Sequence, residues 1–262
     1  MNYTLLTVLG FIIIFIMTTL GASLVYFFKN DISAKANTII LGFAAGVMIA
    51  ASVFSLLLPS LKGAEHLGKW NFVPAAIGFV IGGLFLVAID KIVPHIHNGN
   101  KQEEGPPSSL KKSSKLFLAV TIHNIPEGLA VGFAFGAAAV IKEPALYFSA
   151  FGLALGIGIQ NIAEGAAIAL PMKSVTGSRH KSFLYGVGSG AVEPIFAIIG
   201  YFLAMYLTAF QPWFLAFAAG AMIFVVAEDL IPDSKLAERP HLGTWGVMLG
   251  FVIMMILDVA LG

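Results

Sequence analysis

Long apolar runs, separated by short polar stretches, dominate the sequence. Each run is about 20 residues or longer, which is the length that an α-helix needs to cross the hydrocarbon core of a bilayer. The pattern predicts eight membrane-spanning helices, over residues 4–28, 36–58, 72–93, 116–141, 145–171, 182–208, 213–231 and 242–261. We therefore expect an all-α fold, a polytopic membrane bundle of eight transmembrane helices that forms a single domain over residues 1–262.

One long polar segment, residues 95–114, separates the third and fourth predicted helices. Its Gly, Pro, Ser and charged residues are typical of a flexible loop. The loop begins with a His95-x-His97 pair, which is a candidate for metal contact but too small to define a site alone.

The composition supports a membrane protein and excludes several other classes. The chain is 58% hydrophobic and 11% charged, with a mean hydropathy of +0.90, whereas soluble domains contain about 25% charged residues. A formal net charge of +1 offers no basic face for nucleic acid. The chain contains no cysteine, so disulfides, thiolate metal sites and cysteine nucleophiles are excluded.

The basic residues are distributed unevenly between the two ends of the predicted bundle. Only Lys62, Lys69 and Lys142 fall in loops on one side, and the other twelve lie on the opposite side. By the positive-inside rule, the 91–115 loop is cytoplasmic and both termini are extracytoplasmic. We expect the protein to lie in the plasma (inner) membrane.

Two parts of the sequence resemble each other. The segment that begins Phe43-Ala-Ala-Gly and reaches Pro59 matches the one that begins Phe217-Ala-Ala-Gly and reaches Pro232, and Gly-Phe-Val-Ile recurs at 78–81 and 250–253. The matching helices are five positions apart in chain order. Because five is odd, the copies cross the membrane in opposite directions, so we expect an inverted repeat of helices 1–3 and 6–8 around helices 4 and 5. Such repeats are characteristic of secondary transporters.

Three carboxylates lie in the middle of predicted spans, in Glu127, Glu164 and Glu193, and no Lys or Arg lies at that depth. An unpaired carboxylate in hydrocarbon costs about 3 kcal/mol on insertion scales. These groups must therefore be protonated, hydrated or neutralised by a cation, and a bound cation best explains their common depth. Other acidic residues, Asp90, Glu228, Asp229 and Asp258, lie nearer to helix ends.

The neighbours of these glutamates are further candidate ligands. The fourth helix carries His-Asn-Ile-Pro-Glu-Gly at 123–128 and the fifth carries Gln-Asn-Ile-Ala-Glu-Gly at 160–165, so a polar residue precedes each glutamate by one helical turn. Imidazole, carboxylate and amide oxygen suit Zn²⁺, Fe²⁺, Mn²⁺ or Co²⁺. The candidate metal ligands are His123, Asn124, Glu127, Gln160, Asn161, Glu164 and Glu193.

At these motifs, and at Glu193-Pro194, the chain resembles the ZIP family of divalent metal transporters, in particular its bacterial GufA-like branch. The resemblance covers the whole chain. It implies a homodimer that moves metal into the cytoplasm by alternating access. It also implies that Met48 lies on the transport pathway and that Glu228 lies on the side of cytoplasmic release.

The resemblance further implies two metal positions that share Glu127 and Glu164. The first would add His123 and Gln160, and the second would add Asn124, Asn161 and Glu193. Two residues depart from the family pattern. Close relatives can carry Asp at position 161, and Ala163 replaces a common proline. Loss of the charge at position 161 is expected to weaken the second position.

The sequence thus predicts an importer of Zn²⁺, with Fe²⁺, Mn²⁺ and Cd²⁺ as further substrates, and no catalytic cofactor. We expect a transport pathway that includes Met48, Glu228, Asp229, His95 and His97. Efflux or proton-coupled exchange on the same scaffold is the main alternative, because ligands do not define direction. An intramembrane zinc hydrolase is the enzyme alternative, but the chain lacks a His-Glu-x-x-His helix.

Overall fold

The structure is a computed structural model, which describes residues 2–27, 33–96, 103–234 and 240–261. Eight helices in these ranges are long and apolar enough to cross a membrane, so the all-α bundle is confirmed. These candidate spans are Tyr3–Tyr26, Ala34–Gly63, Phe72–Ile92, Val120–Ile141, Pro144–Leu170, Arg179–Tyr206, Thr208–Leu230 and His241–Leu261. Their ends differ from the predicted ones by only a few residues.

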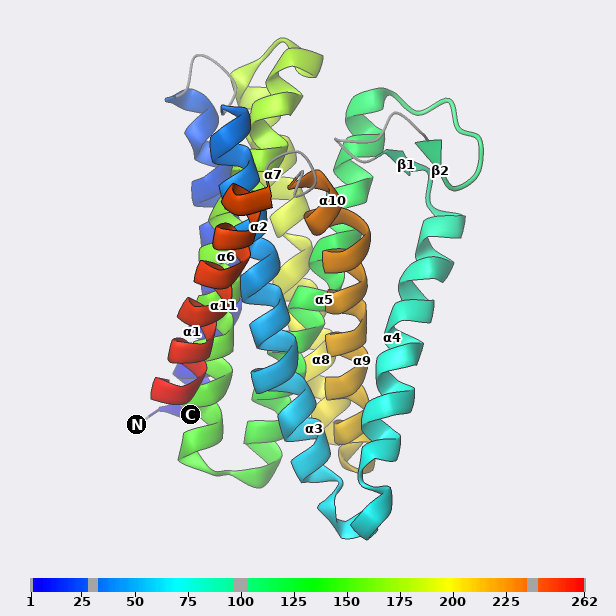
Figure 1. The fold of residues 1–262 in the computed structure, drawn as a ribbon, viewed down its shortest axis with the longest axis vertical. Helices are drawn as coiled ribbons and strands as arrows, with labels where there is room; N and C mark the ends of the chain where they lie inside the picture. Colours follow the sequence, from blue (N-terminus) through cyan, green and yellow to red (C-terminus); the bar gives the residue numbers. More distant parts are fainter. Residues whose placement is uncertain (1, 28–32, 97–102, 235–239, 262) are drawn as a thin grey trace.

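The spans are built from shorter elements (Figure 1). The α-helices are α1 (Tyr3–Ser23), α2 (Ala34–Ala50), α3 (Leu58–Gly63), α4 (Phe72–Ile92), α5 (Lys112–Ile141), α6 (Pro144–Thr176), α7 (Arg179–Gly190), α8 (Val192–Tyr206), α9 (Gln211–Val225), α10 (Ile231–Asp233) and α11 (Pro240–Leu261). Two π-helical segments, η2 (Ala51–Leu57) and η5 (Val226–Leu230), continue α2 and α9. The 3₁₀ segments are η1 (Leu24–Tyr26), η3 (Glu65–Trp70) and η4 (Thr208–Phe210).

Helices α5 and α6 form the centre of the bundle, together with α2 and α9. Within an apolar 18-residue stretch of each span, 67% of the residues are buried in the α5 span and 72% in the α6 span. In the α11 span the share is 17%. The principal packing pairs are α5 with α8, α1 with α6, α2 with α11 and α4 with α9. Polar side chains on α5 and α6 are therefore shielded from lipid by the other helices.

The ends of α5 and α6 explain their antiparallel packing. Lys142 ends α5 in the left-handed conformation (φ 59°), and Pro144 starts α6 two residues later, where the missing N–H of proline is not needed. So short a connection forces the two helices to be neighbours. The motifs at 123–128 and 160–165 consequently lie side by side.

The helices α2 and α9 run in opposite directions in Figure 1, and both continue through a π segment to a proline. Gly250 of α11 packs against the backbone of Phe43, and Gly82 of α4 packs in the same way against Phe217. By these contacts, Gly82 is the counterpart of Gly250. The sequence match had paired Gly250 with Gly78, which lies one helical turn earlier in α4. The inverted repeat as a whole stays a prediction.

The predicted span 182–208 is interrupted at Ala191, between α7 and α8. Pro194 explains the interruption, because it cannot donate a hydrogen bond to the carbonyl of Gly190. Glu193 therefore lies in the first turn of α8, at a break in the helix.

Part of the polar segment 95–114 has regular structure. Strand β1 (His95–Ile96) pairs antiparallel with β2 (Glu103–Glu104), and α5 begins already at Lys112. The start of α1 and the end of α11 lie toward the end of the bundle opposite to these strands in Figure 1. The assignment of either end to the cytoplasm stays a prediction.

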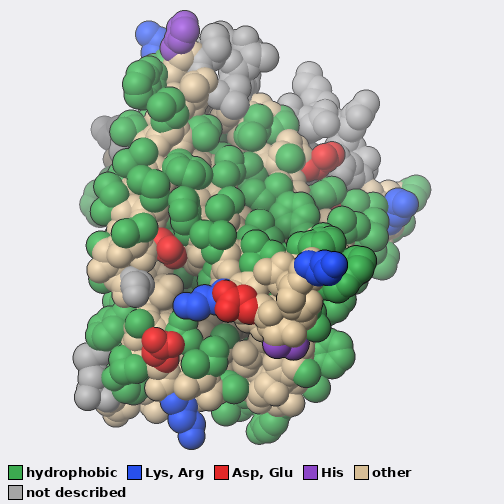
Figure 2. Space-filling view, turned by 60° about the horizontal axis from the view of Figure 1, so that its bottom comes forward, with side chains coloured by type: hydrophobic (Ala, Val, Ile, Leu, Met, Phe, Trp, Pro, Cys, Tyr) green, Lys and Arg blue, Asp and Glu red, His purple; other side chains and the backbone are tan. Residues whose placement is uncertain are grey.

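The outside of the bundle is apolar. Val80 and Leu84 on α4 and Val259 on α11 are among its most exposed side chains, and hydrophobic side chains cover most of the face in Figure 2. A surface of this kind suits the interior of a bilayer, where packing against lipid carries no penalty for apolar groups.

Candidate metal site

A cluster of buried polar side chains lies where α5, α6 and α8 meet. Its members are fully buried except Glu164, which is 7% exposed: Asn124, Glu127, Gln160, Asn161, Glu164 and Glu193. Six of the seven predicted ligands are therefore held in one part of the protein interior. The seventh, His123, lies on the same helix but has a different partner.

Gln160 is the hydrogen-bond donor at the centre of the cluster. Its Nε2 donates to Glu127 Oε1, and it lies 3.4 Å from both Asn161 Oδ1 and Glu164 Oε1. An amide nitrogen has only two hydrogens for these three acceptors. The nitrogen of Gln160 thus occupies a position that is surrounded by oxygen atoms from two helices.

Glu193 lies beside this centre and is held by neutral donors. Its Oε1 accepts hydrogen bonds from Thr18 Oγ1 (2.8 Å) and Asn124 Nδ2 (3.1 Å), and its Oε2 accepts one from Asn161 Nδ2 (2.6 Å). Bonds of this kind from several donors stabilise a buried carboxylate. Oε2 accepts only one of these three bonds, so it retains a lone pair that a metal ion can bind.

The sequence interpretation missed Thr18. The sequence signal for it was spacing: Gly10, Ile14, Thr18 and Gly21 follow one another at intervals of three or four residues. The structure buries these residues as one stripe of α1. That stripe packs on α6 and brings the hydroxyl to Glu193.

Four oxygen atoms in the cluster are buried and have no hydrogen-bond partner. They belong to Asn124 (Oδ1), Glu127 (Oε2), Gln160 (Oε1) and Glu164 (Oε2). All four can accept hydrogen bonds, and none can donate one unless a carboxyl is protonated. Among the described residues, no Lys or Arg forms an ion pair with the three glutamates. The cluster is therefore rich in acceptors and poor in positive charge, which suits a cation.

His123 contacts Asp229, which lies on the segment that follows α9. Its Nε2 lies 3.1 Å from Asp229 Oδ2, which projects from the π segment η5. Asp229 is 8% exposed, whereas its neighbour Glu228 is exposed. Within the described ranges, no three His, Asp or Glu side chains are grouped closely enough to hold a metal ion. In this conformation, His123 thus contacts Asp229, although it lies on the same helix as Asn124 and Glu127.

The other predicted pathway residues lie in different places. Met48 is fully buried in the core. His95 is buried in β1, with Nδ1 2.7 Å from the carbonyl oxygen of Val93 and Nε2 3.5 Å from Asp90 Oδ1. His97 lies outside the described residues.

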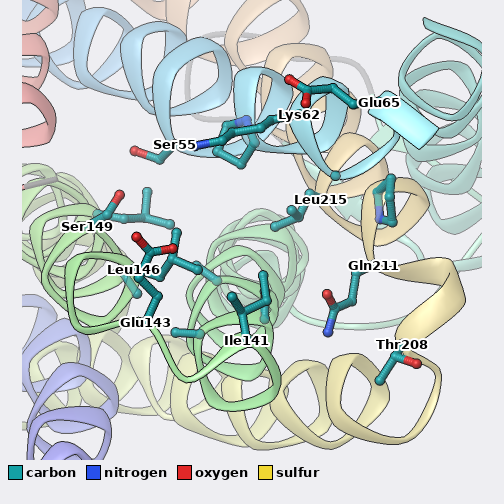
Figure 3. Close-up of a pocket in the computed structure, with 18 of the residues that line it drawn as sticks. Ser55, Lys62, Glu65, Ile141, Glu143, Leu146, Ser149, Thr208, Gln211 and Leu215 are labelled. Atoms are coloured by element: carbon teal, nitrogen blue, oxygen red, sulfur yellow. The ribbon is translucent and has the colours of Figure 1, made fainter. Parts of the chain in front are cut away.

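A cavity of about 480 Å³ lies at the end of the bundle opposite to β1 and β2. Residues from η2 and α3, the end of α5, the start of α6 and the start of α9 line it (Figure 3). Its floor is apolar, with Ala134, Leu153 and Leu215, and its mouth carries charged side chains, including Lys62, Glu65 and Glu143.

The fold and the cluster define an integral membrane protein with a buried acceptor site between its central helices. A sequence profile described as ZIP zinc transporter matches residues 4–116 and 112–258. The chain belongs to the ZIP family.

Named relatives agree with this assignment. Zinc transporter GufA of Myxococcus xanthus is 37% identical over 94% of both chains. Human zinc transporter ZIP11 is 34% identical, also over 94% of both chains. Zinc transporter ZIPB of Bordetella bronchiseptica is 36% identical over 95% of this chain and 79% of its own. Because members of the family are transporters and not enzymes, the hydrolase alternative is set aside.

Proposed function

We propose that this protein imports Zn²⁺ into the cytoplasm by alternating access, with Glu127, Gln160 and Glu164 as the central ligands. The observation that carries the proposal is the surplus of buried acceptor oxygens around Gln160 Nε2. Membership of the ZIP family and the names of the relatives support zinc as the substrate.

A simple rearrangement makes this cluster a metal site. If the amide of Gln160 turns over, its Oε1 takes the place of Nε2, and the oxygens of Glu127, Asn161 and Glu164 already face that point. A divalent ion between Oε1 and these oxygens replaces the amide hydrogens and offsets the two carboxylate charges, and the side chains move apart to admit it. We propose that His123 joins this position through Nδ1 while its Nε2 stays on Asp229, and that Asn124, Asn161 and Glu193 form a second position that shares Glu127 and Glu164.

The expected orientation supports import. With β1 and β2 on the cytoplasmic side, the 480 Å³ cavity opens to the outside. Asp229 and Glu228 lie toward the opposite end and are placed to receive the ion on its way to the cytoplasm. Movement of the central helices relative to α2 and α9 would open the two sides in turn.

The test is uptake of radioactive zinc into proteoliposomes by the wild type and by the isosteric variants Glu127→Gln and Glu164→Gln. We expect uptake to fall at least tenfold in both. Thr121→Val is the control, since the one bond of the Thr121 hydroxyl among the described residues is to the Phe117 carbonyl of its own helix. Uptake in E127Q and E164Q equal to that of the wild type would place the site elsewhere. An internal pH indicator and opposed zinc and pH gradients distinguish import from efflux or proton exchange.

The proposal also includes Fe²⁺, Mn²⁺ and Cd²⁺ as substrates and a homodimer as the assembly. Oxygen and imidazole ligands discriminate poorly among divalent first-row ions such as Fe²⁺ and Mn²⁺, and Cd²⁺ carries the same charge as Zn²⁺. Each of these metals should therefore compete with radioactive zinc for uptake. Light scattering of the purified protein, corrected for detergent, gives the number of chains. A monomeric mass would contradict the dimer without affecting the site.

A further inference from the structure

We infer that Lys62 limits the rate at which divalent cations reach the buried site, through repulsion at the mouth of the cavity. The inference rests on the proposed transport of zinc. Lys62 lies outside the ligand cluster, and the inference concerns the effect of its charge on the uptake rate at low metal concentration.

The cavity lies on the same helix faces as the ligand cluster. On α5, Ala134 of the cavity floor follows Glu127 by seven residues, and on α6, Leu153 precedes Gln160 by seven. A separation of seven residues is two helical turns on one face, about 10 Å along the axis. The cavity is thus aligned with the cluster.

One apolar layer separates the cavity from the cluster. Ala130 and Val131 on α5 and Ile157 on α6 occupy the intervening turn, and all three are fully buried. Met48 and Met222 are fully buried in the same hydrophobic cluster. A cation in the cavity is therefore one closed layer away from its ligands.

The mouth of the cavity combines one positive and two negative side chains. Lys62 is the only lysine or arginine among the described lining residues, and Glu65 and Glu143 are the acidic ones. None of the three forms an ion pair within the described part of the chain. Figure 3 shows Lys62 extending along the cavity wall toward Ser55, and Figure 2 shows charged side chains set among apolar ones at this end. The ammonium group thus acts on the cavity without a carboxylate that neutralises it directly.

The expected size of the effect follows from Coulomb's law. A single and a double positive charge about 8 Å apart in water repel each other enough to lower the local concentration of the dication roughly fivefold. At physiological ionic strength the Debye length is about 8 Å, so screening reduces this to about twofold. The apolar walls of the cavity focus the electric field of the ammonium group, which reduces the screening by salt.

The test varies the charge of the side chain at position 62 by chemical labelling. Because the chain has no cysteine, Lys62→Cys creates a unique thiol, on a side chain that is exposed. The purified variant is labelled in detergent with methanethiosulfonate reagents that leave a trimethylammonium, a neutral methyl or a sulfonate group on the sulfur, and is then reconstituted in neutral lipid. Lys69→Cys with the same labels is the matched control, since Lys69 is exposed on the same side but does not line the cavity.

At zinc concentrations below KM and at low salt, we expect initial uptake to rise about fivefold from the ammonium to the neutral label, and further with the sulfonate. The maximal rate should be unchanged, the differences should shrink toward twofold at physiological salt, and Lys69→Cys should not respond. Equal rates for the three labels at Lys62, an equal response at Lys69, or a response that salt does not reduce would overturn the inference. If the unmodified protein moves no zinc, the proposed function itself fails. If it moves zinc but the labels at position 62 give equal rates, only the inference about Lys62 fails.

Discussion

The Nε2 of His123 lies 3.1 Å from Asp229 Oδ2, so a predicted metal ligand on α5 is joined to the π segment that follows α9. A histidine that binds metal through one ring nitrogen commonly holds a carboxylate with the other, which fixes the orientation of the ring. This contact leaves Nδ1 as the nitrogen that faces away from Asp229. It also connects the ligand cluster to the helix that leads toward the expected cytoplasmic side.

Asp229→Asn is therefore expected to weaken zinc binding about 10- to 100-fold, the usual effect of removing a carboxylate that orients a ligating histidine. Isothermal titration calorimetry on the purified protein measures the change. Asp90→Asn is the matched control, because Asp90 also lies near a histidine, His95, but is carried by α4, which packs mainly on α9. Unchanged affinity in D229N would mean that His123 binds no metal, or binds it without help from Asp229.

Asn161→Asp tests the departure at the second predicted position. The substitution replaces the amide donor that lies 2.6 Å from Glu193 Oε2 with a second carboxylate. Without metal, we expect the variant to be less stable by about 1–3 kcal/mol, as for other lost bonds to charged groups. With zinc, the added charge should increase the stabilisation by ligand.

Thermal unfolding in detergent, with and without zinc, measures both effects. Asn161→Ala separates them, since it removes the same donor and adds no charge. Identical zinc-induced shifts in the wild type and N161D would exclude position 161 from any metal position.

The sequence predicted the bundle well because each span has to satisfy its own backbone hydrogen bonds in lipid, so hydropathy alone locates the helices. It also predicted which polar residues are buried together, since Glu127 and Gln160 are at fixed positions on two adjacent helices. It did not predict the contacts of His123 and Glu193. Those depend on the rotation of α9 and α1, which the π segment η5 and the packing of Thr18 determine, and neither feature has a clear sequence pattern.

The same limit explains the register of the repeated helices. Gly82 and Gly83 are adjacent, but only Gly82 faces the backbone of α9. A Cβ at Gly82 would lie 2.8 Å from the Ala221 nitrogen, whereas one at Gly83 would lie 3.7 Å from the nearest side-chain atom, in Phe224.

Gly82→Ala is expected to lower the free energy of unfolding by about 1–3 kcal/mol through overpacking. Gly83→Ala should be neutral or stabilising by up to about 1 kcal/mol. Melting temperatures of the two purified variants test this, and equal values would contradict the close contact between α4 and α9.

Zinc affinity is expected to fall as the pH is lowered. A metal ion binds carboxylate and imidazole atoms that carry no proton, so protons and zinc compete for Glu127, Glu164 and His123. Each proton that zinc displaces weakens binding about tenfold per pH unit on the acid side. Titrations between pH 5.5 and 7.5 give this slope, and calorimetry in buffers of different ionisation enthalpy counts the protons released. If Glu127 releases one of them, Glu127→Gln should reduce the slope by one. An affinity that does not change with pH would mean that zinc binds only to groups already free of protons in the folded protein, or to oxygens of the amides alone.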